Sequence, residues 1–79
     1  MQVQAKTNDV SLPLLKIGSS GESVRLLQKI LEKLGYDLAF NATYDDVTVA
    51  AVVRFQADNN IGQTGQVGDQ TWRALTDQL

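Results

Sequence analysis

The sequence predicts an all-α fold: a compact three-helix bundle with two glycine- and polar-rich loops and an extended N-terminal arm. Three segments place apolar residues at helical spacing, and clusters of turn-forming residues separate them. The size of the chain agrees, since 79 residues with 43% apolar and 20% charged side chains suit one small globular domain. We expect residues 1–12 to form a linker or flexible arm and residues 13–79 to form the domain.

The entry to the domain is marked by the single proline. Pro13 restricts Leu12 to extended geometry, and a short apolar segment follows with Leu14, Leu15 and Ile17. We expect this segment to lie across the helices as a lid on the core rather than as a strand of a sheet.

The first predicted helix begins after Gly21 and ends near Gly35, which suits a C-cap. Ser19 and Glu22 have the spacing of a capping box, which predicts that the serine caps this helix. The apolar face is predicted to consist of Val24, Leu27, Leu31 and Leu34, with Leu26 and Ile30 beside it.

The second predicted helix is rich in valine, which favours strands, but its apolar residues do not alternate. Their spacing instead lines one helical face with Thr48, Ala51, Val52, Phe55 and Asn59. Asp45 or Asp46 supplies the N-cap, and Asn59-Asn60 with Gly62 supplies the stop. Periodicity therefore predicts a helix here.

The third predicted helix starts near Gly68-Asp69 and carries Trp72, Leu75 and Leu79 on one face. The entries to the second and third helices are alike, because residues 44–52 match residues 67–75 at a constant offset of 23. Each unit has an apolar anchor, a cap, a threonine in the first turn and a small–large apolar pair. The match predicts two helix entries that are built in the same way.

The amino-acid composition and net charge exclude several classes of function. The chain has no cysteine and no histidine, which excludes disulfides, thiolate zinc sites and the usual proton shuttle. A net charge of −2 argues against a protein that holds duplex nucleic acid. The apolar runs are far shorter than a membrane span, and residues 1–12 contain no secretory signal. These features favour a binding module without a cofactor over an enzyme.

Three motifs succeed one another along the chain. The first motif is Leu15-x-x-Gly18-x-x-Gly21-x-x-Val24-x-x-Leu27-Gln28-x-x-Leu31-x-x-Leu34-Gly35-Tyr36. The second is Thr48-x-x-Ala51-Val52-x-x-Phe55-Gln56, and the third is Ile61-x-x-x-Gly65-x-Val67-Gly68-x-x-Thr71-Trp72-x-x-Leu75. Together they cover nearly all of residues 14–75. In this order the motifs resemble the three-helix peptidoglycan-binding domain that is appended to bacterial wall hydrolases and amidases.

The chain departs from the family pattern in the first loop. The family usually has Gly-x-Phe-Gly before the second helix, and here Ala42-Thr43-Tyr44-Asp45 replaces it. The glycines that allow a positive φ are therefore missing. A related three-helix unit forms the propeptide of matrix metalloproteases, but its inhibitory switch needs a cysteine that this chain lacks.

The resemblance implies non-catalytic attachment to peptidoglycan, through its glycan or its stem peptide, with a wall hydrolase or amidase domain as a linked partner. It implies a place in the cell wall or periplasm if the protein is exported; a cytoplasmic location stays open, since this chain carries no signal. A protein–protein interaction module and a hydrolase prodomain also stay open, and either of them would keep the fold without binding the wall.

Peptidoglycan offers hydroxyl, N-acetyl and carboxylate groups, which amide, hydroxyl, aromatic and arginine side chains recognise. The candidate ligand-binding residues are Tyr36, Asn41, Tyr44, Arg54, Asn60 and Gln63. We expect Arg54→Ala and Tyr44→Ala to weaken wall binding while leaving the fold intact.

Other polar and aromatic residues have structural explanations. Trp72 could stack on a sugar, but its helical spacing favours the core, as it does for Phe55. Gln28 and Gln56 could recognise a ligand amide, but we expect them to bond loop backbone that is otherwise unpaired. Asp45 and Asp46 are predicted as helix caps, because the residues after Asn41 lack the glycine and glutamate of a calcium loop. No catalytic or metal-binding residue is predicted.

Overall fold

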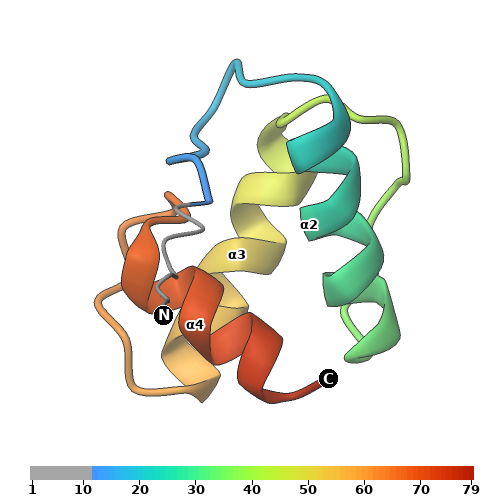
Figure 1. Cartoon of the computed structure of the whole chain (residues 1–79). Helices are drawn as coiled ribbons and strands as arrows, with labels where there is room; N and C mark the ends of the chain where they lie inside the picture. Colours follow the sequence, from blue (N-terminus) through green and yellow to red (C-terminus); the bar gives the residue numbers. More distant parts are fainter. Residues whose placement is uncertain (1–11) are drawn as a thin grey trace, which may run out of the picture.

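The computed structural model describes residues 12–79, and this part of the chain forms three helices (Figure 1). They are α2 (Glu22–Lys33), α3 (Asp46–Asp58) and α4 (Asp69–Asp77), and the described residues contain no strand beyond two isolated bridges. The predicted all-α, three-helix fold is confirmed. The predicted linker lies outside the described residues except for Leu12, which packs against the core.

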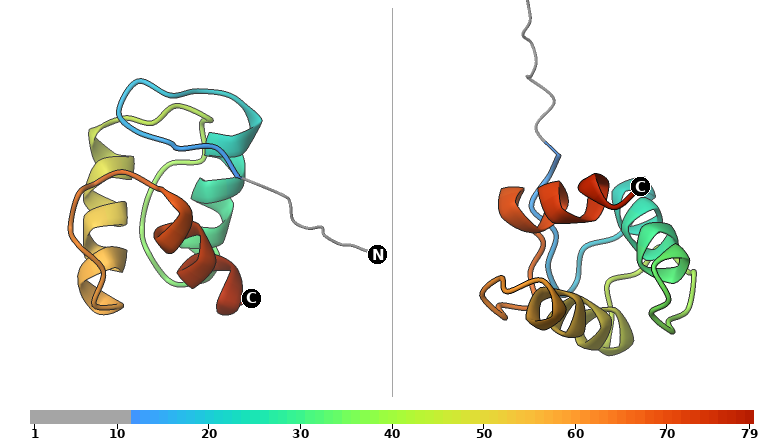
Figure 2. Two further views of the ribbon diagram at one scale, coloured as in Figure 1. Left: turned by 60° about the vertical axis from the view of Figure 1, so that its left-hand side comes forward. Right: turned by 90° about the horizontal axis from the view of Figure 1, so that it is seen from below.

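Helices α2 and α3 begin at the same end of the molecule and run in the same direction (Figure 1). The connection between them therefore returns along the outside of the pair. Figure 2 shows the third helix, α4, closing the opposite side, so that the three helices surround one centre. The extended segment that leads into α2 crosses the end at which α2 and α3 begin.

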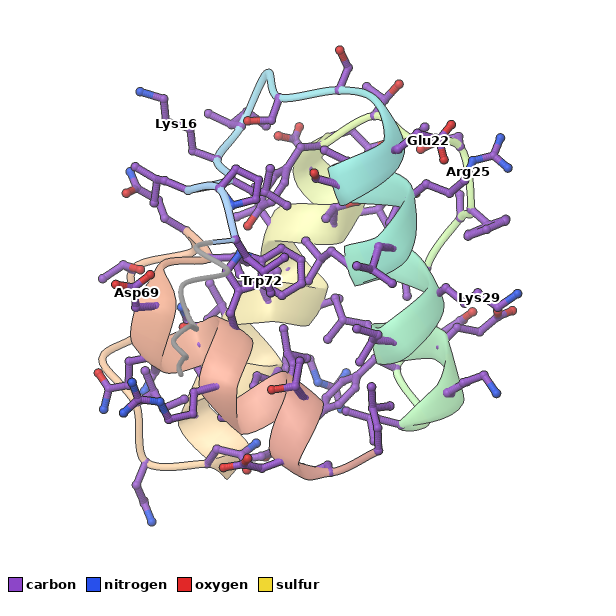
Figure 3. All side chains as sticks on the ribbon, in the orientation of Figure 1. Lys16, Glu22, Arg25, Lys29, Asp69 and Trp72 are labelled. Carbon is purple, nitrogen blue, oxygen red and sulfur yellow. The ribbon has the colours of Figure 1, made fainter. Side chains whose placement is uncertain are left out.

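The core is drawn from all three helices and from the loops. Its buried residues come from the predicted apolar faces: Val24, Leu27, Ile30 and Leu31 on α2, Ala51, Val52 and Phe55 on α3, and Trp72 and Leu75 on α4. Leu15, Tyr44 and Val67 complete it from the connecting segments. Figure 3 shows Trp72 directed between the helices, where its indole Nε1 donates a 2.7 Å hydrogen bond to the carbonyl of Pro13. The prediction that Trp72 and Phe55 are core residues is confirmed.

One residue of a predicted apolar face, Leu79, and one residue predicted beside such a face, Leu26, lie on the surface. Leu79 follows the end of α4 and is 70% exposed, so the apolar face of that helix ends at Leu75. Leu26 is 44% exposed, because it lies on α2 away from the packed side that Leu27 and Ile30 face.

The helix ends agree with the sequence in three places and differ in one. Asp45 caps α3 by accepting a hydrogen bond from the backbone N–H of Thr48, and Gly35 (φ 99°) and Asn60 (φ 59°) end α2 and α3 in the left-handed region. The capping box at Ser19 is wrong. The N-cap of α2 is Gly21, and the Ser19 hydroxyl accepts from Lys16 N–H in the turn before it.

The lid segment is held by backbone pairing with both loop ends. Leu15 exchanges two hydrogen bonds with Val67, at 2.8 and 3.0 Å. Further along, Gly18 N–H donates to Tyr44, and Tyr44 N–H donates to Ser19. Only Leu15 of the predicted lid is buried, while its neighbours Leu14 and Ile17 are more than half exposed.

Candidate functional site

The loop that precedes α3 is organised by one buried glutamine of α2. The side-chain oxygen of Gln28 accepts from the backbone N–H groups of Asn41 and Ala42, at 3.1 and 2.9 Å. Its Nε2 group donates to the Thr43 carbonyl and to the Thr48 hydroxyl, each at 3.0 Å. Both ends of the side-chain amide are thus used to hold the loop against the first turn of the next helix.

A second glutamine does the same for the loop that precedes α4. The oxygen of Gln56 accepts from Gly65 N–H at 3.0 Å, and its Nε2 donates to the Gln66 carbonyl at 2.7 Å and to the Thr71 hydroxyl at 3.2 Å. We call each arrangement an amide clasp, the first centred on Gln28 and the second on Gln56. The prediction that these glutamines bond loop backbone is confirmed.

The clasps extend the internal repeat beyond the stretch that the sequence revealed. Ala42 and Gly65, which lie at the same offset of 23, both donate their backbone N–H to a clasp glutamine and both have a positive φ, 62° and 76°. Replacement of the family's glycine by Ala42 therefore leaves the backbone path intact. The alanine takes up a left-handed conformation that costs a residue with a Cβ about 1 kcal/mol.

An open cleft of about 710 Å³ lies between the α2–α3 connection and the outer side of α3. One wall is the beginning of the connection, from Leu34 to Asp37. The other wall is α3, which contributes Asp46, Val47, Ala50, Ala51, Arg54 and Asp58. This cleft is larger than a second hollow on the described residues. The smaller one, of about 260 Å³, lies beside the second loop and the first turn of α4.

Tyr36 is an aromatic residue of the cleft lining. Its ring packs edge-on against Phe55, with the ring centroids 6.0 Å apart, and its hydroxyl donates a 2.6 Å hydrogen bond to the carboxylate of Asp58. Burial raises the pKa of Tyr36 to about 12, and the hydrogen bond and charge of Asp58 act in the same direction. The positive charge of Arg54 acts in the opposite direction.

Two of the six predicted ligand-binding residues, Tyr36 and Arg54, lie together in this cleft. Asn41 is exposed but engaged in the first clasp, where its Oδ1 accepts from Gln28 and from Thr43 N–H. Asn60 ends α3, and Gln63 is exposed in the second loop; neither lines the cleft.

Tyr44 lies in the core and not on the surface of the first loop. Only 1% of it is exposed, and its hydroxyl donates a 2.6 Å hydrogen bond to the carbonyl of Gly65 in the other loop. Its side chain therefore faces the interior, and the expectation that Tyr44→Ala would spare the fold is wrong. The internal repeat could have predicted the burial of Tyr44, because it pairs Tyr44 with Val67, which is also buried.

The sequence reasoning missed the acidic lining of the cleft. Asp37, Asp46 and Asp58 line it together with Arg54. Three of these four residues lie on one row of α3, because positions 46, 50, 54 and 58 recur at intervals of four. This spacing could have predicted that the charged residues share one side of the helix. These carboxylates do not form a metal site, since no group of three such ligands gathers among the described residues.

Another surface feature lies on α2. The ring of Phe40, from the connection, is bracketed by the Arg25 guanidinium at 5.1 Å and the Lys29 ammonium at 5.9 Å. Figure 3 shows Arg25 and Lys29 directed outward from α2. These cation–aromatic contacts fasten the middle of the connection to the helix. No helix within residues 12–79 is long and apolar enough to cross a bilayer.

Three helices, two clasped loops and an open polar cleft define a small binding module. The family model of the peptidoglycan binding domain matches residues 20–75. The chain belongs to this family, whose members are usually non-catalytic. The predicted family and fold are both confirmed.

Related proteins of known structure share the fold over most of this chain. The SleB N-terminal domain superposes with a TM-score of 0.82 and 28% identity, and the match covers 86% of this chain and 94% of that one. The endolysin of Burkholderia AP3 phage gives a TM-score of 0.81 and 33% identity over 85% of this chain and 26% of the endolysin.

A curated relative is the carboxy-terminal processing protease CtpA of Bacillus subtilis (strain 168). It is 35% identical over 82 aligned residues, which cover 94% of this chain. The chain spans only 18% of the length of that protease.

Proposed function

We propose that this peptidoglycan-binding domain contacts the wall through the cleft beside α3, with Arg54 and Tyr36 as its principal ligand-binding residues. The supporting observation is that the side chain of Arg54 has no partner within residues 12–79. Among the described residues it makes no ion pair and no side-chain hydrogen bond, although it lies in a cleft of about 710 Å³. A guanidinium has five donors in a rigid fork that suits carboxylates, so this one is available to a ligand.

The binding is non-catalytic in this proposal. The buried polar side chains, Gln28, Thr48, Gln56 and Thr71, all belong to the clasps and serve the fold. The charged residues of the cleft are exposed, and three of the four lie along α3, an arrangement that suits recognition. Asn41, Asn60 and Gln63 remain secondary contact candidates, because they are exposed in or beside the two loops.

In this proposal the domain is part of an exported protein, and its linked partner is an enzyme that acts on the cell wall. The endolysin and the protease CtpA are both several times longer than the segment that matches this chain. Tethering to a weakly bound wall anchor raises the effective concentration of the attached enzyme at its substrate. A low affinity for each domain is therefore sufficient.

Co-sedimentation with purified sacculi tests the proposal. We expect the wild-type chain to pellet with the sacculi and Arg54→Ala to remain largely in the supernatant. Arg73→Ala is the matched control, because Arg73 is an exposed arginine on α4, outside both hollows. Both variants should melt like the wild type.

Wild-type protein that stays in the supernatant would overturn wall binding and favour an interaction module or a prodomain. Equal binding by Arg54→Ala and the wild type would remove the cleft from the proposal and leave the loops as the contact surface.

A further inference from the structure

We propose that the cleft beside α3 binds the peptide stem of peptidoglycan, at a point where the stem carries both a free carboxylate and a free ammonium group. This inference rests on the proposed function and specifies which chemical part of the polymer the cleft takes.

The charges of the cleft are arranged in a line along α3. Asp46, Ala50, Arg54 and Asp58 succeed one another at intervals of four residues, and each interval advances about 6 Å along the helix. The single cation is therefore flanked by carboxylates in both directions. Ala50 stands between Asp46 and Arg54, and its small side chain leaves room in the wall of the cleft.

Arg54 provides the site for a carboxylate. The one ion pair among residues 12–79 joins Arg25 to Glu22, so the guanidinium of Arg54 has no carboxylate within 4.0 Å even though three aspartates line the same cleft. An incoming carboxylate can form two parallel hydrogen bonds with it.

The aspartates provide the complementary site. Three carboxylates against one guanidinium give the lining an excess of negative charge, which disfavours a ligand that carries only anionic groups. Asp58 already accepts the hydroxyl of Tyr36. Asp46 and Asp37 make no hydrogen bond through their side chains within residues 12–79, and they are the acceptors left for an ammonium group.

The two halves of peptidoglycan differ in these charges. Glycan strands present hydroxyl and N-acetyl groups, which are neutral. A stem peptide that ends in a free carboxylate and contains a diamino acid presents carboxylates and an ammonium group a few residues apart. The charge pattern along α3 matches the stem, and the aspartates would be of little use to the glycan.

Titration of the ¹⁵N-labelled 79-residue chain with defined fragments tests the inference. The probes are a synthetic stem tetrapeptide with a blocked N-terminus, a free lysine side-chain amine and a free C-terminus, the same peptide acetylated on the lysine amine, the same peptide amidated at the C-terminus, and an uncharged, peptide-free disaccharide of N-acetylglucosamine. We expect the free tetrapeptide to shift the amide signals of α3 around Arg54. Either modification should weaken binding about ten-fold or more.

Two variants assign the two charges. Arg54→Gln should lose the discrimination between the free and amidated C-terminus, and Asp46→Asn should lose the discrimination between the free and acetylated amine. Arg73→Gln and Asp69→Asn, both on α4, should keep both discriminations.

The outcomes separate this inference from the function on which it rests. Binding of sacculi combined with equal shifts from all three peptides, or with shifts from the disaccharide alone, would refute the stem assignment and leave wall binding intact. Failure to bind sacculi would refute both.

Discussion

Gln28 and Gln56 are equivalent residues on successive helices, and each uses both ends of one buried side-chain amide to secure the loop that precedes the next helix. Each is 1% exposed, so solvent cannot replace the hydrogen bonds if the side chain is removed. The conformations of the two loops are therefore fixed by side chains that are buried in the core.

Removal of the first clasp should destabilise the domain strongly. Gln28→Ala leaves two backbone N–H groups and the Thr43 carbonyl without partners and opens a cavity, at a cost of about 2–4 kcal/mol. Chemical denaturation measures the loss. Gln70→Ala, in the exposed first turn of α4, should change the free energy of unfolding by no more than about 0.5 kcal/mol. Equal stability of the two variants would show that the clasp is dispensable.

The left-handed alanine in the first loop should be improved by glycine. Ala42→Gly relieves the steric cost of φ 62°, partly offset by the entropy of the unfolded chain, and should stabilise the domain by about 0.5 kcal/mol. Ala50→Gly, the same chemical change within α3, should instead destabilise it by about 0.5–1 kcal/mol. Opposite signs in paired thermal melts are the expected result, and a loss of stability in both contradicts the assigned backbone.

The two tyrosines should differ in their contribution to stability. Tyr44→Phe removes a buried hydroxyl that bonds the Gly65 carbonyl and should cost about 1–2 kcal/mol, while Tyr44→Ala should cost about 3–5 kcal/mol. Tyr36→Phe loses an exposed bond to Asp58 and should cost less than about 1 kcal/mol. Urea midpoints for the three variants rank the effects; a Tyr44→Ala chain as stable as the wild type would contradict its burial.

Burial of Tyr44 should also make the stability of the domain depend on alkaline pH. Burial raises the pKa of Tyr44 to about 12 from the ordinary 10.0, so the folded state retains a proton that the unfolded chain releases. The resulting stability is complete below the ordinary pKa of 10.0 and is lost as the pH rises toward about 12. Melts over this alkaline range should decline less steeply for Tyr44→Phe than for the wild type. Parallel curves would exclude this source of alkaline sensitivity.

The cap of α3 should give the acid dependence. The backbone N–H of Thr48 lowers the pKa of Asp45, and the side chains of Asn41 and Thr48 also contribute. A carboxylate whose pKa is depressed in the folded state stabilises that state above its unfolded pKa and loses the effect as the pH falls. Asp45→Asn keeps a cap and should flatten the acid limb of the melt profile, whereas Asp45→Ala should lower the melt at neutral pH as well. Asp69→Asn is the control, because that side chain makes no hydrogen bond among the described residues.

The helices and most of the core could be predicted from the sequence because their causes are local. Apolar spacing located all three helices, and it placed Trp72 and Phe55 inside. Asp45 was among the predicted caps because a cap acts within a single turn. The glutamine bonds could also be anticipated, since buried amides must be satisfied.

The predictions from the sequence failed where contacts between segments far apart in the chain determine the structure. Tyr44 is buried because the entry segment pairs with its backbone and Gly65, 21 residues further along the chain, takes its hydroxyl. Ser19 does not cap α2 because Gly21, at φ 105°, starts the helix two residues later. The cleft was missed because it forms only when the α2–α3 connection lies alongside α3. Its role as the ligand site stays a prediction.

The hydrogen bonds between the entry segment and both loops set the order in which contacts would break if the chain were pulled. Tension that arrives along the backbone at Leu12 meets the Trp72 bond to Pro13 first, then the Leu15–Val67 pair, and only then the bonds around Gly18 and Tyr44. None of these contacts involves the outer side of α3. Tension applied at the entry segment would therefore begin to unfold the domain there before it disturbed the cleft.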